Sequence, residues 1–171
     1  NNIDAVYEKK QIKESDIKEI ISEMRNGKIE GINVTVPFKK SVIPFLDKIE
    51  IPEKIQSVNT IYIQKNNITG SNKIVGRNTD VLGFKLSLEN IKYSVKEKKI
   101  FILGAGGVTP SIIYALEEMK PSSIMLSNRT KEKAENLKKT FPQLDLVEWG
   151  DIKNFDMIIN TTSLGLKEND K

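Results

Sequence analysis

Cysteine and histidine are both absent from the 171 residues of this sequence. Without cysteine there can be no disulfide bond and no thiolate metal site, so we expect no metal centre and a cytoplasmic protein. Without histidine, any proton transfer has to use lysine, aspartate, glutamate, tyrosine or water. These absences restrict the chemistry of the chain to a short set of side chains.

Long apolar runs and aromatic residues are also scarce. No apolar run approaches the roughly 20 residues that a membrane span needs, so we expect no membrane partner. Aromatic residues make up 6% of the chain, and its 27 basic residues, against 23 acidic ones, are scattered along it. A nucleic-acid site gathers basic side chains on one face, so we expect no nucleic-acid partner. A composition of 38% apolar and 29% charged residues is typical of a soluble globular protein.

Short strands and helices share the first half of the chain. Ser15 or Asp16 can cap a helix whose apolar residues recur at helical spacing over residues 17–24, and Asn26-Gly27 can end it. We expect further elements here, namely strands at residues 5–7, 32–36, 58–63 and 73–75, a turn at Asn66-Asn67, a helical stretch around Pro44 and Pro52, and a helix over residues 79–90.

Strands and helices alternate in the second half. We expect strands at residues 99–103, 123–127, 144–147 and 157–159, a helix that ends at residue 119, and another over residues 131–140. Such alternation predicts parallel βαβ units. The predicted fold class is therefore α/β, with a first domain at 1–84, a linker helix region at 85–97 and a Rossmann-type domain at 98–171.

A glycine-rich turn, GAGGVT at residues 104–109, follows an apolar strand and opens a helix. Gly104 can make the tight turn, and Gly106 lets a pyrophosphate approach the backbone. The free N–H groups at the N-terminus of the helix then attract phosphate. Glycines mark any tight turn, but the order of strand, turn and helix favours a dinucleotide site.

The end of the next strand indicates which dinucleotide binds. An NAD-binding fold usually places Asp or Glu there, about 20 residues after the glycines, on the ribose 2′-hydroxyl. This sequence has SNRTK at residues 127–131, with Lys133 two residues further on. An arginine without an acid suits the 2′-phosphate of NADP, and a solvated helix start is the alternative.

Three polar clusters lie at strand ends in the first half, at residues 33–39, 57–60 and 77–80. Side chains from strand ends can converge on one cleft, and these offer hydroxyl, amide, ammonium and carboxylate groups that suit a hydroxylated ring. Lys39 and Asp80 would form a proton-transfer pair. Asn and Thr at strand ends are also common turn and cap residues, so that alternative stays open.

Six motifs resemble, in their order, the signature set of the shikimate dehydrogenases: NVTVPFK at 33–39, VNT at 58–60, NTD at 78–80, GAGG at 104–107, NRT at 128–130 and NTTSLG at 160–165. The resemblance covers nearly the whole chain. It implies a two-domain α/β enzyme, with its active site between a substrate-binding domain and an NADP-binding domain. The implied reaction is the reversible, NADP-dependent reduction of 3-dehydroshikimate to shikimate, by a monomer or a homodimer.

The resemblance also assigns roles to individual residues. Lys39 would be catalytic with Asp80 as its partner, and shikimate would contact both of them together with Thr35 and Asn59. The residues that would bind NADP are Gly104, Ala105, Gly106, Gly107, Val108, Asn128, Arg129, Thr130, Lys133 and Thr162.

The chain departs from the family pattern in several places. Val81 stands where the family usually has glycine, and Gln56-Ser57 replaces a small Gly-Ala pair. The family's N-terminal strand with its serine motif, and its C-terminal part with a substrate glutamine, are not in this sequence. We therefore expect a fragment in which both domains are incomplete.

Three alternative functions remain to be weighed. An acid in place of Asn128 would favour an NAD-using quinate/shikimate dehydrogenase paralogue, and no acid is present there. Glutamyl-tRNA reductase can carry a similar Asn-Arg-Thr, but it needs a nucleophilic cysteine, which this chain lacks. A non-catalytic sensor that binds NADP would have no need for both Lys39 and Asp80.

Overall fold

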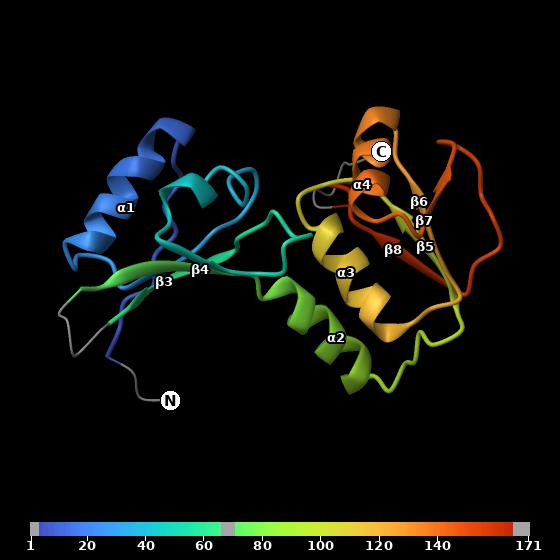
Figure 1. Cartoon of the computed structure of the whole chain (residues 1–171), viewed down its shortest axis with the longest axis horizontal. Helices are drawn as coiled ribbons and strands as arrows, with labels where there is room; N and C mark the ends of the chain where they lie inside the picture. Colours follow the sequence, from blue (N-terminus) through green and yellow to red (C-terminus); the bar gives the residue numbers. More distant parts are fainter. Residues whose placement is uncertain (1–3, 66–70, 166–171) are drawn as a thin grey trace.

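Two β-sheets organise the computed structural model, which describes residues 4–65 and 71–165 (Figure 1). The first sheet has the strand order β1-β3-β4-β2 and is mixed, because β2 runs parallel to β4 while the other pairs are antiparallel. The second sheet has the order β7-β6-β5-β8 and is parallel throughout. The α/β fold predicted from the sequence is confirmed.

The first sheet is covered on one face by the helix α1. Its elements are η1 (Glu14–Asp16), α1 (Ile17–Arg25), β1 (Gly31–Asn33), η2 (Ile43–Phe45), β2 (Lys48–Glu50), β3 (Thr60–Gln64) and β4 (Lys73–Arg77). Ile17, Ile21 and Met24 of α1 are buried against the sheet residues Ile61 and Ile74. As predicted, α1 ends at Asn26-Gly27, where Gly27 takes a left-handed φ of 73°.

Several predictions for this half were wrong. Residues 5–7 form no strand and pair with none of the described strands, and Val6 and Tyr7 are 86% and 77% exposed. Strand β1 ends at Asn33 instead of continuing to residue 36, since the chain turns where Phe38 N donates to Thr35 O. The stretch predicted as helical is helical at η2, where Pro44 lies in the first turn, but it also contains strand β2. The predicted turn at Asn66-Asn67 lies outside the described residues.

A carboxylate joins β2 to β4. Glu50 accepts hydrogen bonds from Lys48 and from Nε of Arg77, both at 2.6 Å, and from the hydroxyl of Tyr62 at 3.2 Å. The hydrogen bonds from Lys48, then from Arg77, lower the pKa of Glu50 to about 2. The short strand β2 is thus held by side chains as well as by its ladder.

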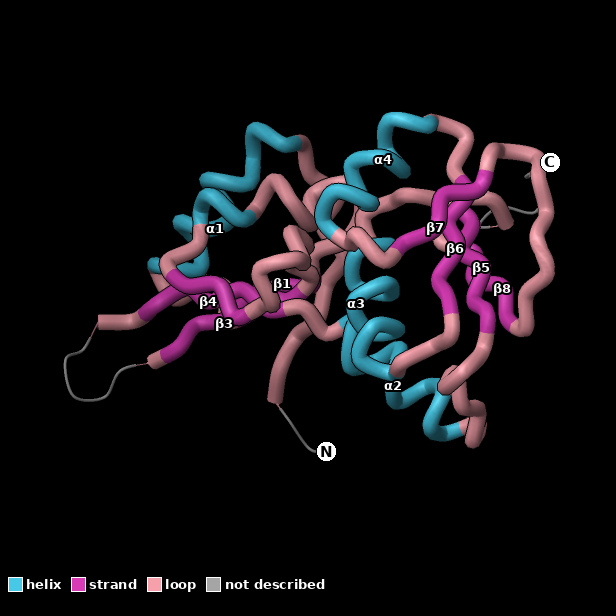
Figure 2. The backbone as a smooth tube through the Cα atoms, turned by 45° about the vertical axis from the view of Figure 1, so that its right-hand side comes forward, coloured by secondary structure: helices cyan, strands magenta, loops and turns pink. Residues whose placement is uncertain are grey.

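Helix α2 (Asp80–Asn90) follows β4 directly and runs beside α3 towards the second sheet (Figures 1 and 2). Its position agrees with the helix predicted over residues 79–90. Leu88 is buried in the core of the second sheet, whereas Leu82 and Leu86 are 60% and 51% exposed. None of the helices that the structure describes combines the length and apolar character needed to cross a membrane.

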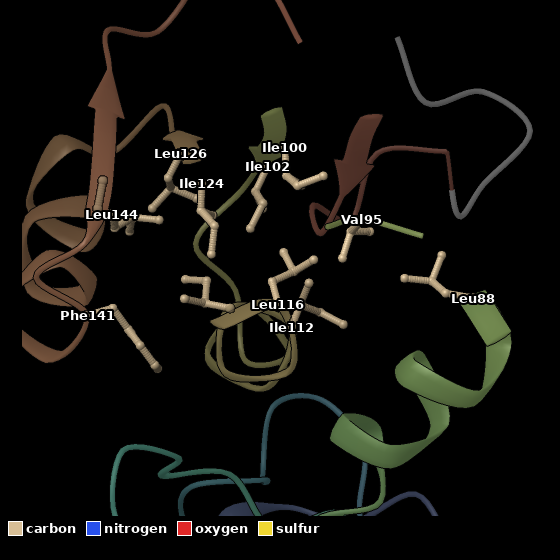
Figure 3. Packing of buried hydrophobic residues seen from close by; sticks show 12 residues of the cluster. Leu88, Val95, Ile100, Ile102, Ile112, Leu116, Ile124, Leu126, Phe141 and Leu144 are labelled. Carbon is tan, nitrogen blue, oxygen red and sulfur yellow. The ribbon is translucent and has the colours of Figure 1, made fainter. Parts of the chain in front are cut away.

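The second half agrees with its predicted elements to within one residue at each strand. These elements are β5 (Lys99–Leu103), α3 (Thr109–Met119), β6 (Ser123–Ser127), α4 (Lys131–Thr140), β7 (Leu144–Val147) and β8 (Met157–Asn160). In Figure 3 the apolar side chains of β5 and β6 face those of α3, with Ile102 and Leu126 fully buried. The strand order reverses between β5 and β8, and open parallel sheets bind ligands at the carboxyl ends of strands on either side of such a reversal.

Candidate active site

Lys39 and Asp80 meet as an ion pair in the first half of the chain. Lys39 comes from the turn after β1, and Asp80 is the first residue of α2. Lys39 Nζ lies 2.7 Å from Asp80 Oδ2, and the two side chains are only 16% and 22% exposed. A lysine ammonium and a carboxylate at this distance can hold, donate and accept a proton.

The amide of Asn59 holds the other oxygen of this carboxylate. Asn59 Nδ2 donates to Asp80 Oδ1 at 2.8 Å and to the hydroxyl of Thr79 at 3.0 Å. Asn59 Oδ1 accepts from the backbone N–H of Thr79 at 2.9 Å and from the hydroxyl of Thr60 at 3.1 Å. Each oxygen of Asp80 therefore has a donor, and the orientation of Asn59 is fixed from two sides.

Thr35 lies on the same turn as Lys39. Its residue is exposed, and its backbone carbonyl accepts the N–H of Phe38 at 3.0 Å. The hydroxyl of Thr35 makes no hydrogen bond to the residues that the structure describes, so it is available to a ligand.

The glycine loop between β5 and α3 is shaped by close contact with the loop after β8. Gly104 has a φ of 103°, and a Cβ there would lie 2.8 Å from Thr162 Cγ2 and 2.9 Å from Thr162 N. A Cβ on Gly106 would lie 3.2 Å from Thr161 O, whereas one on Gly107 would meet no atom within 4 Å. The loop is therefore closed towards β8 and open at Gly107. Val108 then serves as the N-cap of α3.

Asn128 connects the end of β6 to this glycine loop. Its Oδ1 accepts the N–H of Ala105 at 3.0 Å, and its Nδ2 donates to Thr130 O at 2.7 Å. The backbone N–H of Gly104 donates to Ser127 O at 2.9 Å. The predicted cofactor residues after β5 and β6 thus lie together, and Asn128 braces the loop through a contact that spacing alone could not indicate.

Two cations beyond β6 have no anionic partner within residues 4–65 and 71–165. Arg129 and Lys133 are both exposed and form no ion pair there. Lys131, between them in sequence, lies 3.1 Å from Glu148, and the hydrogen bond to this carboxylate raises the pKa of Lys131. Arg129 and Lys133 could therefore bind an added phosphate without first losing a partner.

A cleft of about 500 Å³ joins the two halves of the chain. Its walls include Lys39 from the first half, Gly106 and Gly107 from the glycine loop, and Lys133 from α4. Lys39 and the glycine loop thus border one space. Within the described ranges, no group of three or more Asp and Glu side chains is arranged to hold a metal ion.

Two family models match the chain in the order of its two halves. Residues 1–61 match the substrate-binding domain of shikimate dehydrogenase, and residues 85–165 match shikimate / quinate 5-dehydrogenase. The chain belongs to the shikimate dehydrogenase family. This assignment agrees with the resemblance that the six sequence motifs indicated.

Curated relatives and solved structures agree with this assignment. The shikimate dehydrogenase (NADP(+)) of Pelagibacter ubique is 54% identical over 99% of this chain, and the aligned part is 62% of the relative. The crystal structure of shikimate dehydrogenase from Aquifex aeolicus superposes with a TM-score of 0.82 and 41% identity, covering 94% of this chain and 58% of the other. That of shikimate 5-dehydrogenase from Thermus thermophilus, in complex with NADP(H) and shikimate, has a TM-score of 0.73 and 28% identity, covering 87% and 54%. The chain thus spans about 60% of the length of the curated relatives it matches.

Proposed function

We propose that this chain carries the catalytic lysine and the NADP-binding loop of an enzyme that reversibly reduces 3-dehydroshikimate to shikimate. The observation that carries the proposal is the Lys39–Asp80 pair, at 2.7 Å, beside a cleft that the glycine loop also borders. The names of the relatives, which are shikimate dehydrogenases of the NADP(+) type, support the same reaction.

Lys39 acts as the proton donor in this proposal. When bound, NADPH supplies the hydride to the carbonyl carbon. Lys39 gives its ammonium proton to the carbonyl oxygen as negative charge develops there, so that the product is an alcohol. Asp80 holds Lys39 in position, and Asn59 holds Asp80. In the oxidative direction, neutral Lys39 takes the hydroxyl proton back.

In this proposal the substrate contacts Thr35, Lys39, Asn59 and Asp80. The unpaired hydroxyl of Thr35 can bond a ring hydroxyl directly. Without rotation of the amide, the Nδ2 hydrogen of Asn59 that faces the Thr79 hydroxyl can be shared with a substrate oxygen, because that hydroxyl also lies 3.2 Å from Asn59 Oδ1. The Thr79 hydroxyl then keeps a partner when the substrate binds.

The second half of the chain fits NADP at three points. The open space at Gly107 admits a pyrophosphate, where the N-terminus of α3 directs its dipole. Thr162 lies against Gly104 and so limits where the backbone of the glycine loop can lie. Arg129 and Lys133, which have no ion-pair partner in the described part of the chain, can pair with a 2′-phosphate, and Thr130 between them is the N-cap of α4.

The test uses this chain extended at both ends with the corresponding segments of the Pelagibacter ubique relative, here called the extended chain. We expect shikimate and NADP to yield NADPH, followed by its near-ultraviolet absorbance. Lys39→Ala should lower turnover by about 10² to 10⁴. Lys40→Ala is the matched control, since the neighbouring exposed lysine makes no side-chain hydrogen bond within the described ranges.

The alternatives predict different outcomes of this assay. Turnover that needs NAD and quinate would indicate the paralogue. Tight NADPH binding without any turnover would indicate a sensor and would contradict the proposed reaction. Equal activity in the Lys39→Ala and Lys40→Ala variants would exclude Lys39 as the proton donor.

A further inference from the structure

Asn78, two residues before Asp80, uses its whole side-chain amide in hydrogen bonds. Its Oδ1 accepts the backbone N–H groups of Asp80 at 3.0 Å and Val81 at 3.3 Å, at the start of α2. Its Nδ2 donates to the backbone carbonyl of Ser57 at 2.7 Å and to the hydroxyl of Ser111 at 2.9 Å. Both N–H donors and the acceptor oxygen of the Asn78 amide are therefore hydrogen-bonded.

Ser111 belongs to the other half of the molecule. It is the third residue of α3, the helix that begins at the glycine loop, and it is completely buried. The amide of Asn78 thus ties the start of α2, which presents Asp80, to the first turn of α3. No motif singled out Ser111, because a serine inside an apolar helix carries no sequence signal for a contact 33 residues away.

Other side-chain contacts between the two halves are more exposed. Lys54 Nζ lies 3.1 Å from Glu117 Oε2, and Lys85 Nζ lies 2.8 Å from Glu118 Oε2. The exposed fractions of these four side chains run from 21% to 46%. Exposed ion pairs contribute little to rigidity, because water and salt screen them. A hydrogen bond to a buried hydroxyl is not screened in this way, and breaking it leaves buried polar groups without partners.

We propose that Asn78 is a positioning residue, which sets the distance from Lys39 and Asp80 to the glycine loop through its bond to Ser111. The inference rests on the proposed function. Hydride transfer requires reacting atoms about 3–3.5 Å apart, and the carbonyl is held by the first half while the nicotinamide is held by the second. A loose junction between α2 and α3 would therefore slow the hydride step without removing any group that binds either ligand.

The test compares two buried serine substitutions in the extended chain. Ser111→Ala removes the acceptor of Asn78, and we expect kcat to fall about tenfold to a hundredfold with KM for shikimate and NADP nearly unchanged. The primary deuterium isotope effect should rise, because hydride transfer becomes more rate-limiting. Ser57→Ala is the control: its hydroxyl is buried without a partner in the described residues, and its backbone carbonyl still accepts from Asn78.

Equal kcat and isotope effects in Ser111→Ala and Ser57→Ala would overturn the inference. If Ser111→Ala does not fold, Asn78→Ser carries the same prediction, since serine still caps α2 but cannot reach Ser111. Where both fold, the double variant should be no slower than Asn78→Ser alone, because that substitution already removes the bond to Ser111, and additive losses would also overturn the inference. An unsubstituted extended chain without activity would instead contradict the proposed function, so the two failures are distinct.

Discussion

Replacing Gly104 by alanine would place a methyl group between the loop after β5 and the loop after β8. Two of the atoms that it would meet belong to the backbone, namely Thr162 N at 2.9 Å and the carbonyl carbon of Thr161 at 3.0 Å, and these cannot rotate away. The left-handed backbone of Gly104, at a φ of 103°, adds a second cost. Both costs act on the folded state.

The magnitude follows from these two contributions. A non-glycine residue in a left-handed conformation costs about 1–2 kcal/mol, and an extra carbon in a packed contact costs about 1–3 kcal/mol. We therefore expect Gly104→Ala to lower the free energy of unfolding by about 2–5 kcal/mol, out of the roughly 5–15 kcal/mol typical of a domain.

Two other glycines separate the contributions. Gly27 has a φ of 73° with no atom within 4 Å of an added Cβ, so Gly27→Ala should show the conformational cost alone. Gly107 has open space and no left-handed φ, so Gly107→Ala should change stability by less than about 1 kcal/mol. It should nevertheless weaken NADPH binding at least about tenfold, or 1.4 kcal/mol, because its methyl group occupies the space proposed for the pyrophosphate.

Urea unfolding followed by circular dichroism measures the first effect, and NADPH fluorescence titration measures the second. The reasoning would be refuted if Gly104→Ala and Gly27→Ala unfolded at the same urea concentration, since the contact with Thr162 would then cost nothing. It would also fail if Gly107→Ala bound NADPH as tightly as the unsubstituted chain.

Three further predictions concern the cofactor and acid stability. Arg129→Ala should weaken NADPH about ten- to hundredfold and NADH little, as shown by titration with both, whereas Lys131→Ala, whose lysine is paired with Glu148, should change neither appreciably. Asn128→Ala should weaken both cofactors alike, because the Ala105 N–H loses its acceptor; a loss confined to NADPH would contradict that role. Glu50 has a pKa of about 2 in the folded chain against an ordinary 4.5, so the stability that ionised Glu50 contributes is complete above pH 4.5 and is lost as the pH falls towards 2. The stability of the Glu50→Gln variant against urea should therefore decline less over this pH range. An unchanged decline would exclude Glu50 as the cause of the acid sensitivity.

The second half of the fold could be predicted because its signals are local. Strands β5 and β6 are continuous apolar runs, and glycine and proline mark the turn into α3. In the first half the decisive interactions join distant residues. The three residues of β2 are a strand only because they pair with β4, whereas residues 5–7 have strand-like composition but no partner. Local preference misleads in both cases because ladder pairing outweighs it.

The candidate site shows the same division. Lys39 and Asp80 are 41 residues apart, and nothing in their spacing places them at 2.7 Å; the polar clusters at strand ends and the family resemblance together suggested the pair. Asn128 is predicted to contact the cofactor, and its amide also bonds the glycine loop and Thr130, which the motif does not indicate. The direction of a side-chain amide depends on tertiary neighbours, so a motif can identify the residue without identifying its bond.

Helix α2 has consequences for how the molecule unfolds. It begins with Asp80 beside Lys39, and Leu88 near its other end packs in the core of the second sheet. Its 11 residues form a rod about 16 Å long, which contacts the first half through the Lys39–Asp80 ion pair and the second half through apolar packing. Although the chain has two sheets and two separate cores, melting the first half would release the Asp80 end of α2 from Lys39, and melting the second half would release the Leu88 end. Heat should consequently unfold both halves in one cooperative transition.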